Sequence, residues 1–318
     1  MSQDLIKEIQ QDIGIEEIEN DNSGGNALDA LEALSSEIQS EISVYLPGLD
    51  IDAVVTPLTG KEDLSLKTSK TTLSIFTEKL NKVLFERTKF PEEIQSKLKN
   101  YKDFQKLILP CDKAMLIYAL IKTSYEKISD QNITCENPDC QKEFVETFDV
   151  NQIEVHVETL LKDTEFKNGY SFKFKQEFLG GALEIYIGMN SEEVKLELLK
   201  RLEKENKNPK NTMNQMMSLY DTLFLVTKEI VIKSKKTGEV ITKLTSDTKK
   251  GRNEIYKFYK EMSPKIRDNI LNEMDLSEMN DYLPEFNIVT HCPYCHTEMK
   301  TPISVEDEFF RKALFIYE

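Results

Sequence analysis

The sequence predicts a mostly helical α+β protein with a core domain and one large insertion. Helical periodicity recurs in several segments, which favours helices for most of the chain. Two short glycine-containing turns lie between runs of β-branched residues, as β-hairpins require. Four of the five cysteines form two close pairs far apart in the chain. The residues between these pairs are therefore expected to leave the core and return to it.

The two cysteine pairs have the spacing of metal ligands. Cys135 and Cys140 end the motif Cys-Glu-Asn-Pro-Asp-Cys, and Cys292 and Cys295 end the motif Cys-Pro-Tyr-Cys. A zinc ribbon takes two thiolates from each of two tight turns, with roughly two to four residues between the ligands. We therefore predict a split four-cysteine zinc ribbon with one structural Zn²⁺ per chain. Four thiolates complete a tetrahedron and leave no position for a reactive water.

The remaining histidines and cysteine are weaker ligand candidates. His291 and His296 flank the second pair, and either could replace a cysteine, but residues beside such a turn usually point away from the metal. The third histidine is His156. We expect Cys111 to be a buried thiol, because its surroundings lack the cationic setting that activates a cysteine nucleophile.

A metal bound by both pairs would organise the chain into three parts. We predict a zinc-ribbon core domain formed by residues 44–150 plus 286–318, and an inserted, mainly helical domain formed by residues 151–285. Residues 1–43 are predicted to be an acidic N-terminal tail with short amphipathic helices. Residues 1–50 contain twelve acidic residues and one lysine, so this region carries most of the net charge of −15.

The tail is the predicted partner-binding segment. Residues 2–18 place four apolar side chains on one helical face, and a glycine-containing stretch at 20–25 separates them from the next helical pattern at 27–42. The four residues are Leu5, Ile6, Ile9 and Ile13. A helix this short is marginal in water, so we expect it to order on a partner. Alternatively, the tail docks on its own domain or only keeps the protein soluble.

Local patterns predict the other elements. In the core domain we expect short strands from residue 44, helices over 72–86 and 111–126, and strands on both sides of each cysteine turn. The insertion is predicted to begin with a loose helical pattern. Its later elements are hairpins at 170–189 and 230–241, a helix capped by Asn190 and Glu193 that runs to about 205, a methionine-rich helix at 213–224, and a helix from Ser263-Pro264 to about 274.

Several functional classes lack their signatures. The chain has no Gly-x-Gly-x-x-Gly, no Gly-Lys-Ser/Thr and no His-Glu-x-x-His motif, and three histidines offer little for a catalytic triad. We therefore expect no enzyme activity and no small-molecule substrate. No apolar run approaches a membrane span, and the first residues lack the pattern of a secretory signal. We accordingly expect a reducing compartment, where paired cysteines more often bind metal than form disulfides.

Several short motifs follow one another in an informative order. They are Leu46-Pro47-Gly48, Pro57-Leu58-Thr59-Gly60-Lys61-Glu62-Asp63, a helix from Asp112 that ends at Thr123-Ser124-Tyr125, the first cysteine turn, Phe148-Asp149-Val150, and the second cysteine turn before Phe309-Phe310-Arg311. This order resembles the baseplate hub proteins of contractile-tailed phages of the T-even type. The resemblance covers roughly residues 44–150 and 286–318.

The resemblance implies a non-catalytic role in a phage tail baseplate hub, as a structural subunit or as an assembly factor. Other hub or tail proteins would be the partners, and the chain would act in the host cytoplasm during assembly or in the baseplate of the virion. One alternative is a zinc-ribbon regulator that binds nucleic acid through the basic insertion, with Lys233, Lys235, Lys236, Lys249, Lys250 and Arg252. The net charge argues against that reading. A second alternative is a chaperone-like adaptor for one tail protein.

Overall fold

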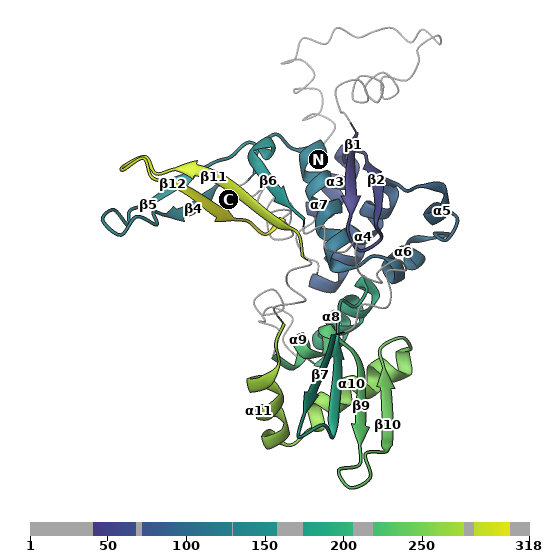
Figure 1. Ribbon diagram of the computed structural model, residues 1–318. Coiled ribbons are helices and arrows are strands. Elements are labelled where there is room, and N and C mark those ends of the chain that lie inside the picture. The colour runs from purple at the N-terminus through teal and green to yellow at the C-terminus, as the bar shows by residue number, and fades with distance from the viewer. Residues whose placement is uncertain are drawn as a thin grey trace, which may run out of the picture. The chain divides into compact units, whose positions relative to one another are not determined.

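Helices and antiparallel sheets together build the described part of the chain, which confirms a mixed α+β fold (Figure 1). The computed structural model describes residues 41–67, 72–128, 130–157, 174–205, 219–276 and 283–305. The predicted tail helices, with Leu5, Ile6, Ile9 and Ile13, lie outside the described residues. So do the motif Phe309-Phe310-Arg311 and residues 213–218 of the predicted methionine-rich helix.

The first elements form a small sheet covered by helices. Strands β1 (Ile42–Leu46), β2 (Ile51–Val55) and β3 (Thr88–Lys89) form an antiparallel sheet in that order. The helices of this region are α3 (Gly60–Lys67), α4 (Leu73–Arg87), α5 (Glu92–Gln95), α6 (Tyr101–Leu107) and α7 (Pro110–Ser124). Helices α4 and α7 confirm the predictions for 72–86 and 111–126. Every residue from 115 to 121 in α7 is buried, so this helix is the centre of the packing.

Three contacts join segments that precede α4 to the two ends of α7. The backbone N–H of Gly48 donates to Oδ1 of Asp112 at 2.7 Å. At the other end, the N–H of Leu58 donates to Oγ of Ser124 at 3.0 Å. The hydroxyl of Tyr125 donates to Oδ1 of Asp63 at 2.7 Å. Motifs far apart in the sequence are therefore direct neighbours in the fold.

Gly48 is constrained by this arrangement. A Cβ atom at position 48 would lie 2.6 Å from Oδ2 of Asp112, closer than real Cβ contacts allow. Asp112 is fully buried, and its Oδ2 also accepts from the N–H of Leu109 at 3.4 Å. Burial raises the pKa of Asp112 to about 7, although the backbone donors, first that of Gly48, act in the opposite direction.

The cysteine turns lie between short strands. Strands β4 (Gln131–Thr134) and β5 (Glu143–Glu146) pair with each other, and β11 (Glu285–His291) pairs with β12 (Glu298–Pro302). We call these four strands and their two turns the cysteine module. The predicted strands beside each cysteine turn are confirmed.

The start of the predicted insertion differs from the expectation of a loose helical pattern. A 3₁₀ turn η1 (Val150–Gln152) is followed by β6 (Ile153–His156), which pairs antiparallel with β11. Four residues are too few to display a strand period clearly, and the pairing partner lies more than a hundred residues later. The third sheet therefore has the order β12-β11-β6 and crosses the predicted boundary at residue 150.

The remaining described elements form what we call the hairpin lobe, residues 174–205 and 219–276. Its sheet has the order β10-β9-β8-β7, with β7 (Phe174–Phe178), β8 (Leu183–Ile187), β9 (Thr227–Lys233) and β10 (Val240–Thr245). Its helices are α8 (Glu192–Glu205), α9 (Leu219–Val226), α10 (Lys249–Glu261) and α11 (Pro264–Glu273). Both predicted hairpins and the helix after Ser263 are confirmed. The turn between β7 and β8 has Gly180 and Gly181 at positive φ, as predicted.

Asn190 has a different role from the predicted helix cap. Its Nδ2 donates to the carbonyls of Leu225 and Thr227, both at 2.9 Å, and its Oδ1 accepts from Oγ of Ser246 at 2.9 Å. The side chain is therefore occupied in joining α9, β9 and the loop after β10. These partners are distant in sequence, so a local capping pattern could not reveal them.

Two apolar clusters divide the described residues. One contains β1, β2, α4, most of α7 and the base of the cysteine module. The other contains the inner faces of β7, β8 and β9 together with α8, α9, α10 and α11, and it also includes Leu109 and Cys111 from the start of α7. Cys111 is buried, as predicted, and burial raises its thiol pKa. The predicted domain division remains a prediction.

Candidate metal centre

The two cysteine turns are built on a similar plan. In the first turn the N–H of Cys135 donates to the carbonyl of Lys142 at 3.0 Å, and in the second the N–H of Cys292 donates to the carbonyl of Thr297 at 2.9 Å. The residue directly after the second cysteine has positive φ in both turns, 46° for Gln141 and 60° for His296. Each turn thus reverses the chain direction and places its two thiols on the same side of the turn.

The first turn is longer by two residues, and Asn137 stabilises the extra length. Its carbonyl accepts from the N–H of Cys140 at 2.9 Å, and its side-chain Oδ1 accepts from the N–H of Asp139 at 3.0 Å. An asparagine that bonds its own backbone two residues on is a common turn device. The wider spacing of the first pair is therefore compatible with the same placement of sulfur atoms.

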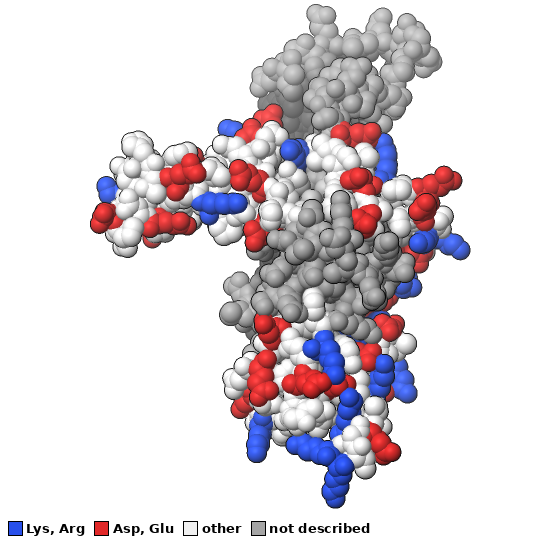
Figure 2. Space-filling model, viewed as in Figure 1, with Lys and Arg blue, Asp and Glu red and all other residues white. Residues whose placement is uncertain are grey.

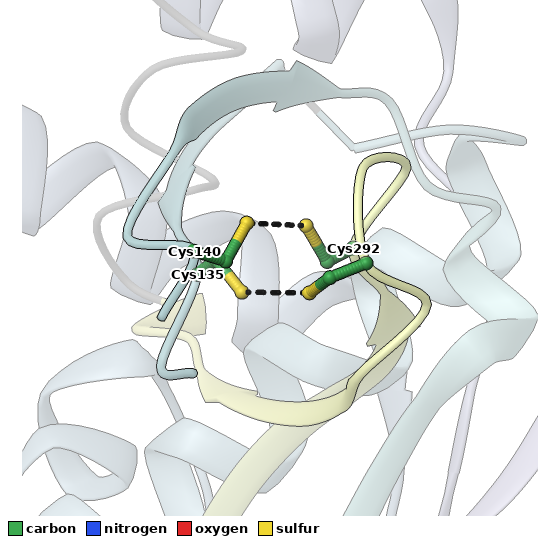
Figure 3. A group of neighbouring side chains, drawn as sticks. Cys135, Cys140 and Cys292 are labelled. Carbon is green, nitrogen blue, oxygen red and sulfur yellow. Dashed lines mark hydrogen bonds between the residues drawn. The ribbon is translucent and has the colours of Figure 1, made fainter. Parts of the chain in front are cut away.

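All four sulfur atoms lie within 4.8 Å of one another. The Sγ atoms of Cys135 and Cys295 are 3.5 Å apart, and those of Cys140 and Cys292 are 3.8 Å apart (Figure 3). A disulfide would require an S–S distance of about 2.05 Å, so these are four free thiols. The structure brings the four predicted ligands together from segments that are 152 residues apart at their nearest ends.

The sulfur distances of 3.5 and 3.8 Å are close to the edge length of a tetrahedral site. With a Zn–S bond of about 2.3 Å, the edge of a regular tetrahedron of four sulfur atoms is about 3.8 Å. Cys135 and Cys292 are buried, whereas Cys140 and Cys295 are partly exposed, so one side of the cluster is open to solvent. In the described part of the chain, this is the group of His, Cys, Asp and Glu side chains whose ligand atoms are close enough to hold a metal ion.

Asn137 and Thr297 surround the sulfur of Cys295. Oγ1 of Thr297 lies 3.2 Å from this sulfur, and Nδ2 of Asn137 donates to it at 3.8 Å. Nδ2 of Asn137 also donates to Oγ1 of Thr297 at 3.1 Å. The two polar side chains come from opposite turns, so they join the halves of the cluster. Sequence reasoning did not identify either residue, because Asn and Thr in turns are too common to be informative.

These neighbours favour the thiolate form of Cys295. Hydrogen bonds from Thr297, by its side chain and then its backbone, lower the pKa of Cys295 to about 6. Burial acts oppositely on Cys135 and raises its thiol pKa to about 12. Thiolates are the form of cysteine that binds metals, so this lowered pKa favours Cys295 as a metal ligand.

The flanking histidines are outside the cluster. Nε2 of His291 lies 3.5 Å from Oε2 of Glu298, and the side chain is largely exposed. His296 supplies the residue with positive φ and is not part of the group of ligand atoms. His156 lies on β6. These placements agree with the expectation that the residues beside the cysteines point away from the metal.

The chain matches no protein-family model, no curated protein and no solved structure in the three comparisons. None of the helices in the described ranges combines the length and apolar composition needed to cross a membrane. The site itself must therefore support any statement of function.

Proposed function

We propose that this chain is a non-catalytic component or assembly factor of a phage tail baseplate hub and acts by binding other hub or tail proteins. The observation that carries the proposal is the set of contacts around α7. The segments that resemble the hub family bond to one another there: Gly48 to Asp112, Leu58 to Ser124, and Asp63 to Tyr125. Direct contacts between these motifs are what a shared hub fold would require.

The later motifs support the proposal in the same way. The N–H of Ile128 donates to the carbonyl of Phe148, and the N–H of Val150 donates to the carbonyl of Glu126, both at 2.9 Å. The motif Phe148-Asp149-Val150 therefore packs against the chain that leaves α7. All of these contacts are structural, which fits a protein whose sequence pattern preserves a fold and no catalytic site.

The proposal includes a split zinc ribbon as the structural centre of the cysteine module. Four thiols within 4.8 Å of one another, with sulfur distances of 3.5 and 3.8 Å across the two turns, favour zinc, which binds thiolates in closed structural sites. Cys135 and Cys140 would supply one half of the ligands, and Cys292 and Cys295 the other. The metal would hold β4–β5 against β11–β12 and would take part in no reaction.

The charges of the described residues disfavour the nucleic-acid alternative. Residues 130–157 and 283–305, which include the cysteine module, contain nine acidic residues and two lysines. Lys and Arg side chains gather at the end of the hairpin lobe that carries the β9–β10 turn (Figure 2). However, Lys233 is paired with Glu184 at 2.7 Å, and Arg252 is buried beside Glu197. Two of the six predicted cations are therefore already paired with carboxylates, which weakens this surface as a match for the many phosphates of a nucleic acid.

The partner-binding segment in this proposal is the apolar face of residues 2–18. The test compares the tagged full-length chain with a variant that lacks residues 1–25, each expressed in the cells that make the natural protein. Mass spectrometry of copurifying proteins should identify hub or tail proteins with the full-length chain only. Both proteins should have the same melting temperature and metal content. Mass spectrometry of purified virions then distinguishes a permanent subunit from a transient factor.

A pair of point variants sharpens this test. Ile9→Asp places a charge on the apolar face, whereas Gln11→Asp adds the same charge to a polar position of the same segment. We expect Ile9→Asp to lose the partner and Gln11→Asp to keep it. Copurification of nucleic acid in place of tail proteins would favour the regulator, and a single extended tail protein would favour the adaptor.

A further inference from the structure

The hairpin lobe contributes to a cavity of about 490 Å³ whose wall also includes the segment from α6 to α7. The side chains at its wall include four cations, which are Lys106, Lys228, Lys249 and Arg252, and two anions, Glu193 and Asp247. An excess of cations is unusual in this acidic chain, whose net charge is −15. Arg252 is balanced by Glu197, so the positive character of the wall comes from its three lysines.

The wall of the cavity is held in place by hydrogen bonds among buried groups. Nε and Nη2 of Arg252 donate to the two carboxylate oxygens of Glu197 at 2.8 and 2.9 Å, and Nη1 donates to the carbonyl of Ser246 at 3.1 Å. Ser246 in turn donates to Asn190. A Cβ atom at Gly251 would overlap the carbonyl oxygen of Thr245, so the chain can pass this point only with glycine. The site is thus shaped before a ligand arrives.

Two features place positive charge at an accessible position. Lys249 is exposed and makes no ion pair or hydrogen bond with any described residue, whereas Lys228 is more than nine-tenths buried. The wall therefore extends from an exposed ammonium group inward to a buried cation. The first turns of α8 and α10 also border the cavity, and the positive ends of their dipoles add to the same field.

We propose that this cavity binds a phosphate group. Counted with Glu197, which holds Arg252, the wall has a formal excess of one positive charge, and this favours an anion such as phosphate, which carries a charge of about −1.5 to −2 at neutral pH. The side chains that line the cavity include no aromatic ring, and the two apolar ones are Leu109 and Val194. A nucleotide base would therefore have no stacking surface, so the ligand is inorganic phosphate or a compact phosphomonoester.

The test is titration of the full-length chain with sodium phosphate, with sodium chloride at equal ionic strength as the salt control. Glycerol phosphate in a parallel titration distinguishes a phosphomonoester from free phosphate. Lys249→Gln should weaken phosphate affinity about tenfold, because it removes one charge-assisted hydrogen bond. Lys250→Gln is the matched control, since Lys250 is the next residue of α10, is exposed and does not line the cavity.

The binding measurements either support or overturn the proposed phosphate site. Saturable binding of either phosphate compound that is weakened by Lys249→Gln and unchanged by Lys250→Gln supports the proposal. No saturable binding at all, or an equal loss in both variants, overturns it, and so does an equal response to chloride. Because neither lysine belongs to the cysteine cluster or to residues 2–18, the result is independent of the proposed hub function.

Discussion

The cysteine module and the hairpin lobe are both built from β-hairpins, but different forces hold them. In β8, four of the five residues are buried, and in β9 five of the seven are. In β4 and β5 together, Ile133 is the single buried residue of eight. A hairpin with so little buried apolar surface is marginal by itself. The β4–β5 hairpin therefore depends on the sulfur cluster, whereas the lobe depends on apolar packing. In the other half of the module, four of the seven residues of β11 are buried.

A few cross-contacts support the module but cannot replace the cluster. Oγ1 of Thr290 in β11 donates to Oε2 of Glu146 in β5 at 2.5 Å, and the N–H of Glu136 donates to the sulfur of Met299 at 3.4 Å. Each such bond contributes about 1 kcal/mol net. A structural zinc in a small domain contributes roughly 10–16 kcal/mol of apparent binding free energy. The metal should therefore dominate the stability of this region.

The largest expected effect comes from breaking the cluster with Cys292→Ser. The wild-type protein should contain about one zinc per chain, and the variant should lose it, with a loss of stability on the order of 5 kcal/mol in the module. Hydrogen exchange should show that the amides of β4, β5, β11 and β12 lose protection. The amides of β8 and β9 should keep theirs, because the lobe has its own core.

Two control variants test whether the loss of zinc and of stability is specific to the cluster. Cys111→Ser changes a buried thiol outside the cluster and should leave the zinc content unchanged. Ile230→Ala removes a fully buried side chain of the lobe and should cost about 2–5 kcal/mol while the metal remains bound. A wild-type protein that contains no metal and keeps its melting temperature in strong chelator would contradict the proposed metal site.

The second effect concerns a buried ion pair between α7 and α8, where the two apolar clusters meet. Nζ of Lys113 in α7 lies 2.8 Å from Oε2 of Glu192 in α8, and both side chains are at most 2% exposed. Removing one partner of a buried ion pair leaves an uncompensated charge, which typically costs about 3–5 kcal/mol. Glu192→Gln should therefore lower the unfolding free energy by this amount in urea denaturation.

An exposed ion pair provides the control for Glu192. Nζ of Lys200 in α8 lies 2.8 Å from Oε2 of Glu78 in α4, and both side chains are more than a third exposed. Glu78→Gln should cost about 1 kcal/mol or less, because solvent screens such pairs. The double variant Lys113→Met with Glu192→Leu should recover most of the lost stability. Equal costs for Glu78→Gln and Glu192→Gln would show that the buried pair has no special role.

The third effect is a pH dependence that originates in α7. The pKa of Asp112 is about 7 in the folded protein and about 3.9 in an unfolded chain, so the folded state holds the proton more tightly. Its stabilising contribution is therefore complete below about pH 4 and is lost as the pH rises to about 7, by at most about 1.4 kcal/mol per pH unit. Asp112→Asn cannot titrate and lacks this slope.

Urea unfolding of both proteins between pH 4.5 and 7.5 measures this effect. The unfolding free energy of the wild type minus that of Asp112→Asn should decrease as the pH rises, since groups common to both proteins cancel in the difference. Asparagine keeps an oxygen that can accept from the N–H of Gly48. A difference that does not change with pH would mean that the carboxyl has an ordinary pKa.

Sequence patterns predicted the elements that are determined by residues close together in the chain. The cysteine spacing identified the four sulfur atoms that the structure brings together, because two close pairs have few other uses in one chain. Helix α7 and both hairpins of the lobe were likewise predictable, since each shows a clear period or turn. The same reasoning placed Cys111 inside the protein, because nothing around it suggested a reactive thiol.

The predictions that were wrong or missing involve distant partners. Asn190 resembles a helix cap in sequence, yet its side chain bonds residues 35 to 56 positions away. Strand β6 exists because β11 pairs with it. The Lys113–Glu192 pair and the cavity beside Arg252 arise only after two separate segments have packed, so no window of sequence contains them.

The distance between the two cysteine turns also has a consequence for synthesis on the ribosome. Cys140 and Cys292 are 152 residues apart, which at roughly 5–20 residues per second separates their appearance by roughly 8–30 seconds. During this interval Cys135 and Cys140 lack their partner thiols, while the residues of the hairpin lobe are being synthesised. The cluster must therefore close late, and a nascent chain would be most vulnerable to oxidation or to incorrect metal capture in that interval.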